Sequence, residues 1–283
     1  MGLLAYFGWV FSQATSRLGA AGFFPTALKV VRMDQNDDGA KCIWHDEERP
    51  EEPTLIEGLP GHGLVASIAV NQVTNQLGLS HHASIQSPKF PPVATFDDGL
   101  VQELVRVYAG ENPPVMTLQS DLALPPDALE PVSKCVLSEV ATQYQRAIFI
   151  AGAPAESEDQ LGSVQGVATS EELREELKGA GVPVAEEHGI VGGITGALVR
   201  ECYQLEIPAI LLIVRAHPQV PDPGAAKSVI ETALEPIVEF EIDTTELEDQ
   251  AEEIQSQMRQ IAQQYEQAAT EQEVETQPKG MFQ

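Results

Sequence analysis

Basic residues are scarce in this chain. Its 283 residues include 16 Lys and Arg against 43 Asp and Glu, which gives a formal net charge of −27. A surface of this charge repels polyanions, so the composition excludes non-specific binding to nucleic acid or to anionic membranes. Because high salt screens such self-repulsion, we predict a halophilic protein, with a mesophilic acidic protein as the alternative.

Cysteine is scarce as well, with three residues at Cys42, Cys135 and Cys202. Their odd number and wide separation match neither a disulfide framework nor a metal-ligand spacing. We therefore predict buried thiols in a reduced cytoplasm, no metal and no cofactor. The neighbours His81 and His82 point to opposite sides of a strand and do not easily share a metal ion. Signatures of catalysis such as H-E-x-x-H and G-x-S-x-G are absent, so we predict no catalytic residue.

Long hydrophobic runs are also missing near the N-terminus. The apolar run over 3–11 is far shorter than the roughly 20 residues that span a bilayer, and no basic residue precedes it. Residues 1–32 carry three cations and no acid, a charge of +3, whereas residues 33–283 carry 13 cations and 43 acids, a charge of −30. We predict an N-terminal extension over 1–32. It is either a translated upstream extension with Met33 as the natural start or an amphipathic surface anchor.

The rest of the chain alternates apolar runs with helical patterns, which predicts one α/β domain over 33–243. Hydrophobic residues make up 43% of the chain, enough for a large core. We expect strands over 54–56, 83–86, 93–96, 101–108, 115–119, 147–152 and 209–214. We expect helices over 64–77, 126–145, 171–178, 193–205 and 225–238, the third of them capped by Ser170.

The C-terminal part is different in character. A helix is expected over 244–268, because apolar residues recur there with heptad spacing. The stripe consists of Leu247, Ala251, Ile254, Met258, Ile261 and Tyr265. It packs either on its own domain or between subunits. Residues 269–283 have too little apolar area to fold and form a flexible acidic tail that ends in Met281, Phe282 and Gln283.

Two glycine-rich turns lie between an expected strand and an expected helix. The first contains Gly58, Gly61 and Gly63, and the second contains Gly192, Gly193 and Gly196. Helix N-terminal amides with little side-chain bulk attract anions, so both are candidate anion-binding turns. Neither turn matches the P-loop or the dinucleotide fingerprint, and tight strand-to-helix packing is the favoured alternative. Glu57 lies directly before the first turn and is the strongest candidate for a functional carboxylate.

Three stretches together resemble the archaeal branch of the proteasome assembly chaperone family, in a PAC2-like form. They are LIEGLPGHGLV at 55–65, SPKFPP at 87–92 and GIVGGITG at 189–196. The resemblance extends from Ile43 to Tyr265. It implies a nucleoside phosphorylase-like architecture, with a mixed, largely parallel sheet flanked by helices. Combined with the charge, it indicates a haloarchaeal source.

The resemblance also implies a function. Members of the family assist assembly of the 20S proteasome core, and some end in a hydrophobic-tyrosine-any tripeptide that enters pockets between α-subunits. Here Met281 and Gln283 match that pattern, but Phe282 stands in place of tyrosine, so we expect weaker docking. The sequence predicts a non-catalytic, cytoplasmic homo-oligomer that binds 20S α-subunits partly through its tail. The alternative is a nucleotide-binding ligase or hydrolase that uses the turns at 58–63 and 192–196.

Overall fold

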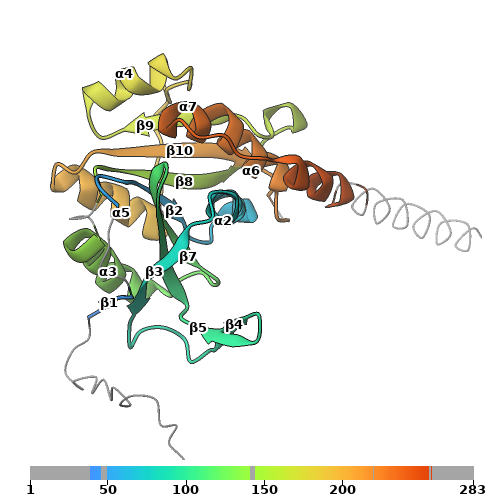
Figure 1. Cartoon of the computed structure of the whole chain (residues 1–283). Helices are drawn as coiled ribbons and strands as arrows, with labels where there is room; N and C mark the ends of the chain where they lie inside the picture. The colour runs from blue at the N-terminus through green and yellow to red at the C-terminus, as the bar shows by residue number, and fades with distance from the viewer. Residues whose placement is uncertain (1–38, 46–49, 141–143, 219, 255, 257–283) are drawn as a thin grey trace, which may run out of the picture. The chain divides into compact units, whose positions relative to one another are not determined.

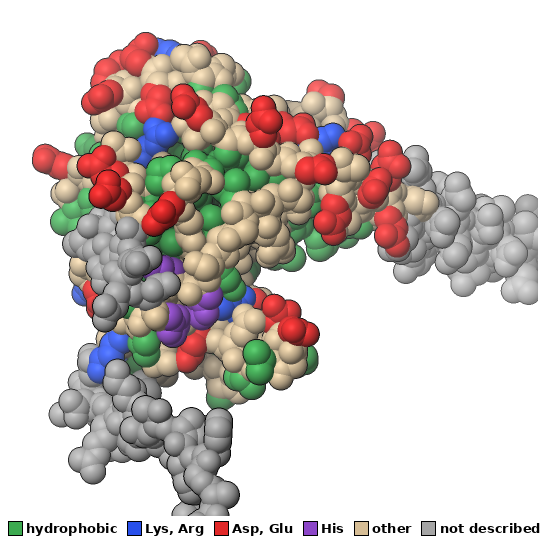
Figure 2. Space-filling view, in the orientation of Figure 1, with side chains coloured by type: hydrophobic (Ala, Val, Ile, Leu, Met, Phe, Trp, Pro, Cys, Tyr) green, Lys and Arg blue, Asp and Glu red, His purple; other side chains and the backbone are tan. Residues whose placement is uncertain are grey.

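The computed structural model describes residues 39–45, 50–140, 144–218, 220–254 and 256. The predicted extension over 1–32, the tail over 269–283 and the tripeptide Met281, Phe282 and Gln283 all lie outside these ranges. None of the described helices is both long and apolar enough to pass through a bilayer. Acidic side chains far outnumber basic ones on the face shown in Figure 2.

An eight-stranded sheet is the centre of the described part (Figure 1), with the strand order β1-β3-β6-β7-β2-β8-β10-β9. The strands are β1 Lys41–Trp44, β2 Thr54–Gly58, β3 Ser80–Gln86, β6 Val105–Glu111, β7 Pro114–Ser120, β8 Arg146–Pro154, β9 Val164–Ala168 and β10 Ala209–Ala216. The four neighbours β7, β2, β8 and β10 run parallel, and the other neighbouring strands pair antiparallel. The predicted α/β fold with a mixed sheet is confirmed, and its parallel part is the four central strands.

Helices cover both faces of this sheet. They are α2 Val65–Gln76, α3 Pro126–Cys135, α4 Glu171–Gly179, α5 Gly193–Gln204, α6 Pro223–Val229 and α7 Glu235–Val238, with short turns η1 His62–Leu64, η2 Val136–Val140, η4 Glu158–Gln160 and η5 Ile230–Leu234. Side chains alternate along β8, so Ile148 packs with α2, α4 and α6 while Phe149 packs with α3 and α5. Because both faces are covered, β8 and β10 are apolar along most of their length, which is why the sequence shows them clearly.

Most predicted elements are confirmed, including β8, β10 and the cap of α4, where the Leu173 amide donates to Ser170 Oγ over 3.3 Å. The strand predicted over 101–108 is wrong as one element. It consists of β5 Leu100–Gln102, which forms a separate hairpin with β4 Thr95–Asp97, and of β6. The chain turns between them, where Glu103 O accepts from Arg106. The helix predicted over 126–145 consists of α3 and the π-helical turn η2 and is described as far as Val140. The helix predicted over 225–238 likewise consists of α6, the π-helical turn η5 and α7.

Two edge strands were not predicted. β1 pairs with β3, and β9 pairs with β10 and also forms a single bridge from Gly166 to Val184. An edge strand has one neighbour and tolerates polar residues such as those of β9, so it lacks the long apolar run of a central strand.

The C-terminal helix begins at residue 245 and is described through residue 254. Leu247 is 3% exposed and belongs to the α2 side of the core, and Ala251 and Ile254 are half-buried beside Pro221 and Pro223. The first half of the predicted stripe therefore packs on its own domain. Its second half, Met258, Ile261 and Tyr265, lies outside the described residues.

Candidate functional site

The two glycine turns meet at the carboxyl ends of the parallel strands. The first turn follows β2, and the second leads into α5. Gly61, His62, Gly192 and Thr195 line a cavity of about 450 Å³ together with the ends of β8 and β10, which contribute Gly152, Pro154 and Arg215 among others. Open α/β sheets commonly bind ligands in a crevice at this edge.

Packing explains three of the six predicted glycines. A Cβ on Gly58 would lie 2.5 Å from Val70 Cβ, and one on Gly196 would lie 2.2 Å from Val191 O. Gly63 has a φ of 63°, and a Cβ there would lie 3.0 Å from Ala216 Cβ. These positions require glycine because the turns lie tightly against the sheet and the helices.

The remaining glycines of the two turns are less constrained. A Cβ on Gly61, Gly192 or Gly193 would meet nothing within 4 Å, although Gly193 has a φ of 69°. Gly61 and Gly192 line the cavity from opposite turns. Anion binding by these turns stays a prediction.

Gly152 of β8, which was not predicted as a site residue, holds the first turn close to the strand. A Cβ on Gly152 would lie 2.1 Å from the backbone oxygen of His62. Since that atom belongs to the backbone, no side-chain rotation relieves the contact. The close approach of the turn to the strand therefore depends on Gly152.

The carboxyl group of Glu57 links the two turns by hydrogen bonds. Its side chain is fully buried, and its Oε1 accepts a hydrogen bond from the Leu59 amide over 3.0 Å. Thr195 Oγ1, in the first turn of α5, lies 3.4 Å and 3.3 Å from the two carboxyl oxygens and donates to them. Burial raises the pKa of Glu57 to about 8, although the bonds from Leu59 and Thr195 act in the opposite direction. The sequence singled out Glu57, but only the fold identifies Thr195 as its partner.

The histidines do not assemble into a site. His62 Nε2 is buried without a hydrogen-bond partner among the described residues. His81 contacts His45 with ring centroids 4.6 Å apart and ring planes tilted by 59°. His82 packs edge-on against Trp44 with ring centroids 5.6 Å apart. The two adjacent histidines thus face opposite ways, as predicted. The described ranges contain no group of three or more His, Cys, Asp or Glu residues arranged to hold a metal ion.

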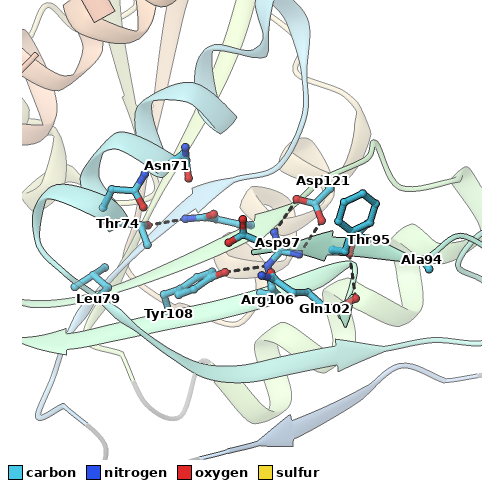
Figure 3. A pocket seen from close by; sticks show the side chains of 13 residues that line it. Asn71, Thr74, Leu79, Ala94, Thr95, Asp97, Gln102, Arg106, Tyr108 and Asp121 are labelled. Atoms are coloured by element: carbon cyan, nitrogen blue, oxygen red, sulfur yellow. Dashed lines mark hydrogen bonds and ion pairs between the residues drawn. The ribbon is translucent and has the colours of Figure 1, made fainter. Parts of the chain in front are cut away.

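A larger cavity of about 660 Å³ lies under the β4–β5 hairpin and was not predicted (Figure 3). Arg106 of β6 crosses its floor and donates to both carboxyl oxygens of Asp121, each over 2.7 Å. Arg106 Nε also donates to Tyr108 Oη over 3.0 Å. The Arg106 guanidinium lowers the pKa of Asp121, and the hydrogen bonds to Asp121 raise the pKa of Arg106. In the sequence this site is marked by one arginine, Arg106, between Val105 and Val107, two valines that the structure buries.

Comparison with known proteins matches most of the chain to one family. The model of the PAC2 family matches residues 55–262. An uncharacterised protein of Methanocaldococcus jannaschii is 27% identical over 194 residues, which are 69% of this chain and 79% of that protein.

Solved structures show the same fold. Pyrococcus furiosus PbaA, described as an archaeal homolog of proteasome-assembly chaperone, superposes with a TM-score of 0.72 at 26% identity and covers 84% of this chain and 97% of its own. PbaB of the same organism, described as an archaeal proteasome activator, also has a TM-score of 0.72 at 23% identity, with 80% and 99% covered. These likenesses are consistent with the prediction that the chain is not an enzyme. With the family model matched over more than half of its length, the chain belongs to the PAC2 family.

Proposed function

We propose that this chain is a non-catalytic, proteasome assembly chaperone-like protein that binds 20S proteasome α-subunits. The observation that carries the proposal is membership of the PAC2 family together with the likeness to PbaA over 84% of the chain. We further propose that it acts as a homo-oligomer in the cytoplasm.

The C-terminal tripeptide is the proposed contact. Phe282 would fill an apolar groove between α-subunits, while the terminal carboxylate would pair with a lysine of the partner. The described start of the C-terminal helix supports this mode, because Leu247 is 3% exposed and anchors the helix to the body. The chain that continues beyond residue 256 therefore departs from a fixed point. In a homo-oligomer, several tails would bind with avidity.

Co-migration with α-subunit rings of the same organism tests this proposal. We expect the full chain to shift with the rings in native electrophoresis, and a chain without Met281, Phe282 and Gln283 to bind at least tenfold more weakly. Equal binding by both chains would contradict the tail contact. If neither chain bound the rings, the proposal that α-subunits are the partner would be refuted.

The alternative, a nucleotide-binding ligase or hydrolase, has one observation in its favour. The two turns converge on a cavity of about 450 Å³, and Gly61 and Gly192 open onto it. Membership of the PAC2 family stands against it. Titration calorimetry with ATP and GTP separates the two functions, because heat of binding that disappears in Gly192→Val would favour the alternative.

A further inference from the structure

The β4–β5 hairpin exposes three large apolar side chains that the proposed tail contact does not use. Phe96, Leu100 and Val101 are 77%, 71% and 79% exposed, and we call them the hairpin knob. The hairpin projects beyond the main sheet in Figure 1, and Figure 2 shows hydrophobic side chains beside acidic ones on the same projection. Single exposed apolar residues are ordinary, but three on one small projection mark an interaction surface.

The hairpin has two different faces. Phe96 pairs with Val101 across the strands, and Thr95 pairs with Gln102. Since directly opposite residues of an antiparallel pair share a face, Phe96 and Val101 form one apolar face. The pair Thr95 and Gln102 shares the other face with the pair Asp97 and Leu100. The cavity of Figure 3 is lined by Arg106 and Asp121 together with four hairpin residues, Thr95, Phe96, Asp97 and Gln102.

Arg106 and Asp121 brace this projection. A two-stranded hairpin is at best marginally stable on its own. Thr95 Oγ1 donates to Gln102 O over 3.0 Å within the hairpin. Thr95 also helps to lower the pKa of Asp121, which Arg106 holds through two bonds. Arg106 is 7% exposed, so its position is fixed by the core. A knob held in place before binding loses less conformational entropy when it docks.

The charges near the knob decide which kind of partner fits. Asp97 is the last residue of β4 and Asp98 lies in the turn of the hairpin, and both are exposed. The described ranges of a second copy offer few cations to set against them, because seven of the ten Lys and Arg there already form ion pairs within the chain. These seven are Arg106, Lys134, Arg146, Arg174, Lys178, Arg200 and Lys227. Charge complementarity therefore favours a different protein with a basic surface.

We propose that the hairpin knob docks into an apolar pocket bordered by Lys or Arg on the α-subunit ring. This second contact rests on the proposed function and extends it, because it adds a braced apolar anchor to the proposed contact of the tail. Asp97 and Asp98 would pair with the basic border, and Phe96 and Val101 would fill the pocket.

The test measures binding of full-length variants to α-subunit rings of the same organism. We expect the double variant Phe96→Ser, Val101→Ser to bind about tenfold or more weakly, since both residues would be buried on docking. Tyr203→Ser is the matched control, because Tyr203 on α5 is 67% exposed and lies outside the hairpin. The control is expected to bind as the unchanged chain does.

A second arm tests the charges and the choice of partner. Asp97→Asn, Asp98→Asn is expected to make the association rate less sensitive to salt. Undiminished ring binding by the Phe96→Ser, Val101→Ser variant would overturn the proposal while leaving the proposed function intact. A fall in its oligomer mass by sedimentation, without a specific loss of ring binding, would also overturn it, because a second copy would then cover the knob. If the unchanged chain failed to bind rings, both the knob contact and the proposed function would be refuted.

Discussion

At the scale of single residues, Glu57 makes stability depend on pH. Its pKa is raised from 4.5 to about 8 because the carboxyl group is fully buried. The unfolded chain releases this proton near pH 4.5, whereas the folded chain keeps it until about pH 8. The contribution of Glu57 is thus fully present below pH 4.5, declines as the pH rises and is lost above about pH 8. Relative to Glu57→Gln, the unchanged chain should lose about 4 kcal/mol over this range.

Urea unfolding at about pH 5 and about pH 8 measures this difference. Gln has nearly the same shape as Glu and no charge, so the variant removes the titration and keeps the packing. Glu156→Gln is the control, because Glu156 is exposed and the same substitution there should leave the pH dependence unchanged. Parallel pH curves for Glu57→Gln and the unchanged chain would show that Glu57 is not held neutral by burial.

Gly152 tests whether the first glycine turn is shaped by packing. In Gly152→Ala the new Cβ would lie 2.1 Å from His62 O, so the turn must move away from β8. We expect a loss of about 2 kcal/mol or more in the free energy of unfolding. Gly61→Ala, in the same turn, meets nothing within 4 Å and should change stability by no more than about 0.5 kcal/mol. Similar losses in both variants, measured by chemical denaturation, would contradict a packing origin for this turn.

At the scale of elements, Leu247 tests how the C-terminal helix is attached. It is 3% exposed within the core on the α2 side of the sheet. Leu247→Ala should therefore lower the free energy of unfolding by about 3 kcal/mol. Ile254→Ala, at a half-buried position of the same stripe, should cost less. A variant that kept its stability but lost oligomer mass in sedimentation would instead show that the stripe packs between subunits.

The elements that the sequence predicts are those whose signal is local. The apolar runs of β8 and β10 and the Ser170 cap of α4 need no knowledge of distant residues, and all three are confirmed. The edge strands β1 and β9 have no such run, because one partner and partial exposure suffice for them. At the break between β5 and β6, the backbone oxygen of Glu103 accepts from Arg106 Nη1, a contact that has no periodic signal in the sequence.

The candidate sites required the tertiary structure. The two glycine turns are separated by more than half of the domain in sequence, yet Glu57 and Thr195 join them through one carboxyl group. Cys42 and Cys135, far apart in the chain, also come close enough to share a hydrogen bond, which raises the pKa of Cys135. Contacts between distant residues leave no periodic signal in one sequence, so propensity alone does not reveal them.

At the scale of the whole molecule, the proposals combine two contacts of different character. The tail is predicted from its composition to be flexible and would contribute chiefly when several copies bind at once. The hairpin knob, in contrast, is braced by Arg106 and Asp121. The tail contains acidic residues, and the hairpin knob lies next to Asp97 and Asp98, in a chain whose net charge is −27. Binding through either contact should therefore weaken as salt rises, and the charged hairpin turn should affect the association rate most.

The identity of residue 282 tests the tail contact most directly. Phe282→Tyr would restore the hydroxyl group of the family pattern, and one added hydrogen bond is worth about 1 kcal/mol. We therefore expect the variant to bind α-subunit rings about fivefold more tightly per tail, measured as Kd by surface plasmon resonance. Gln277→Tyr places the same side chain elsewhere in the tail and should leave the affinity unchanged. An equal gain in affinity from both variants would mean that a tyrosine anywhere in the tail suffices. The rings would then not recognise the final tripeptide as a motif.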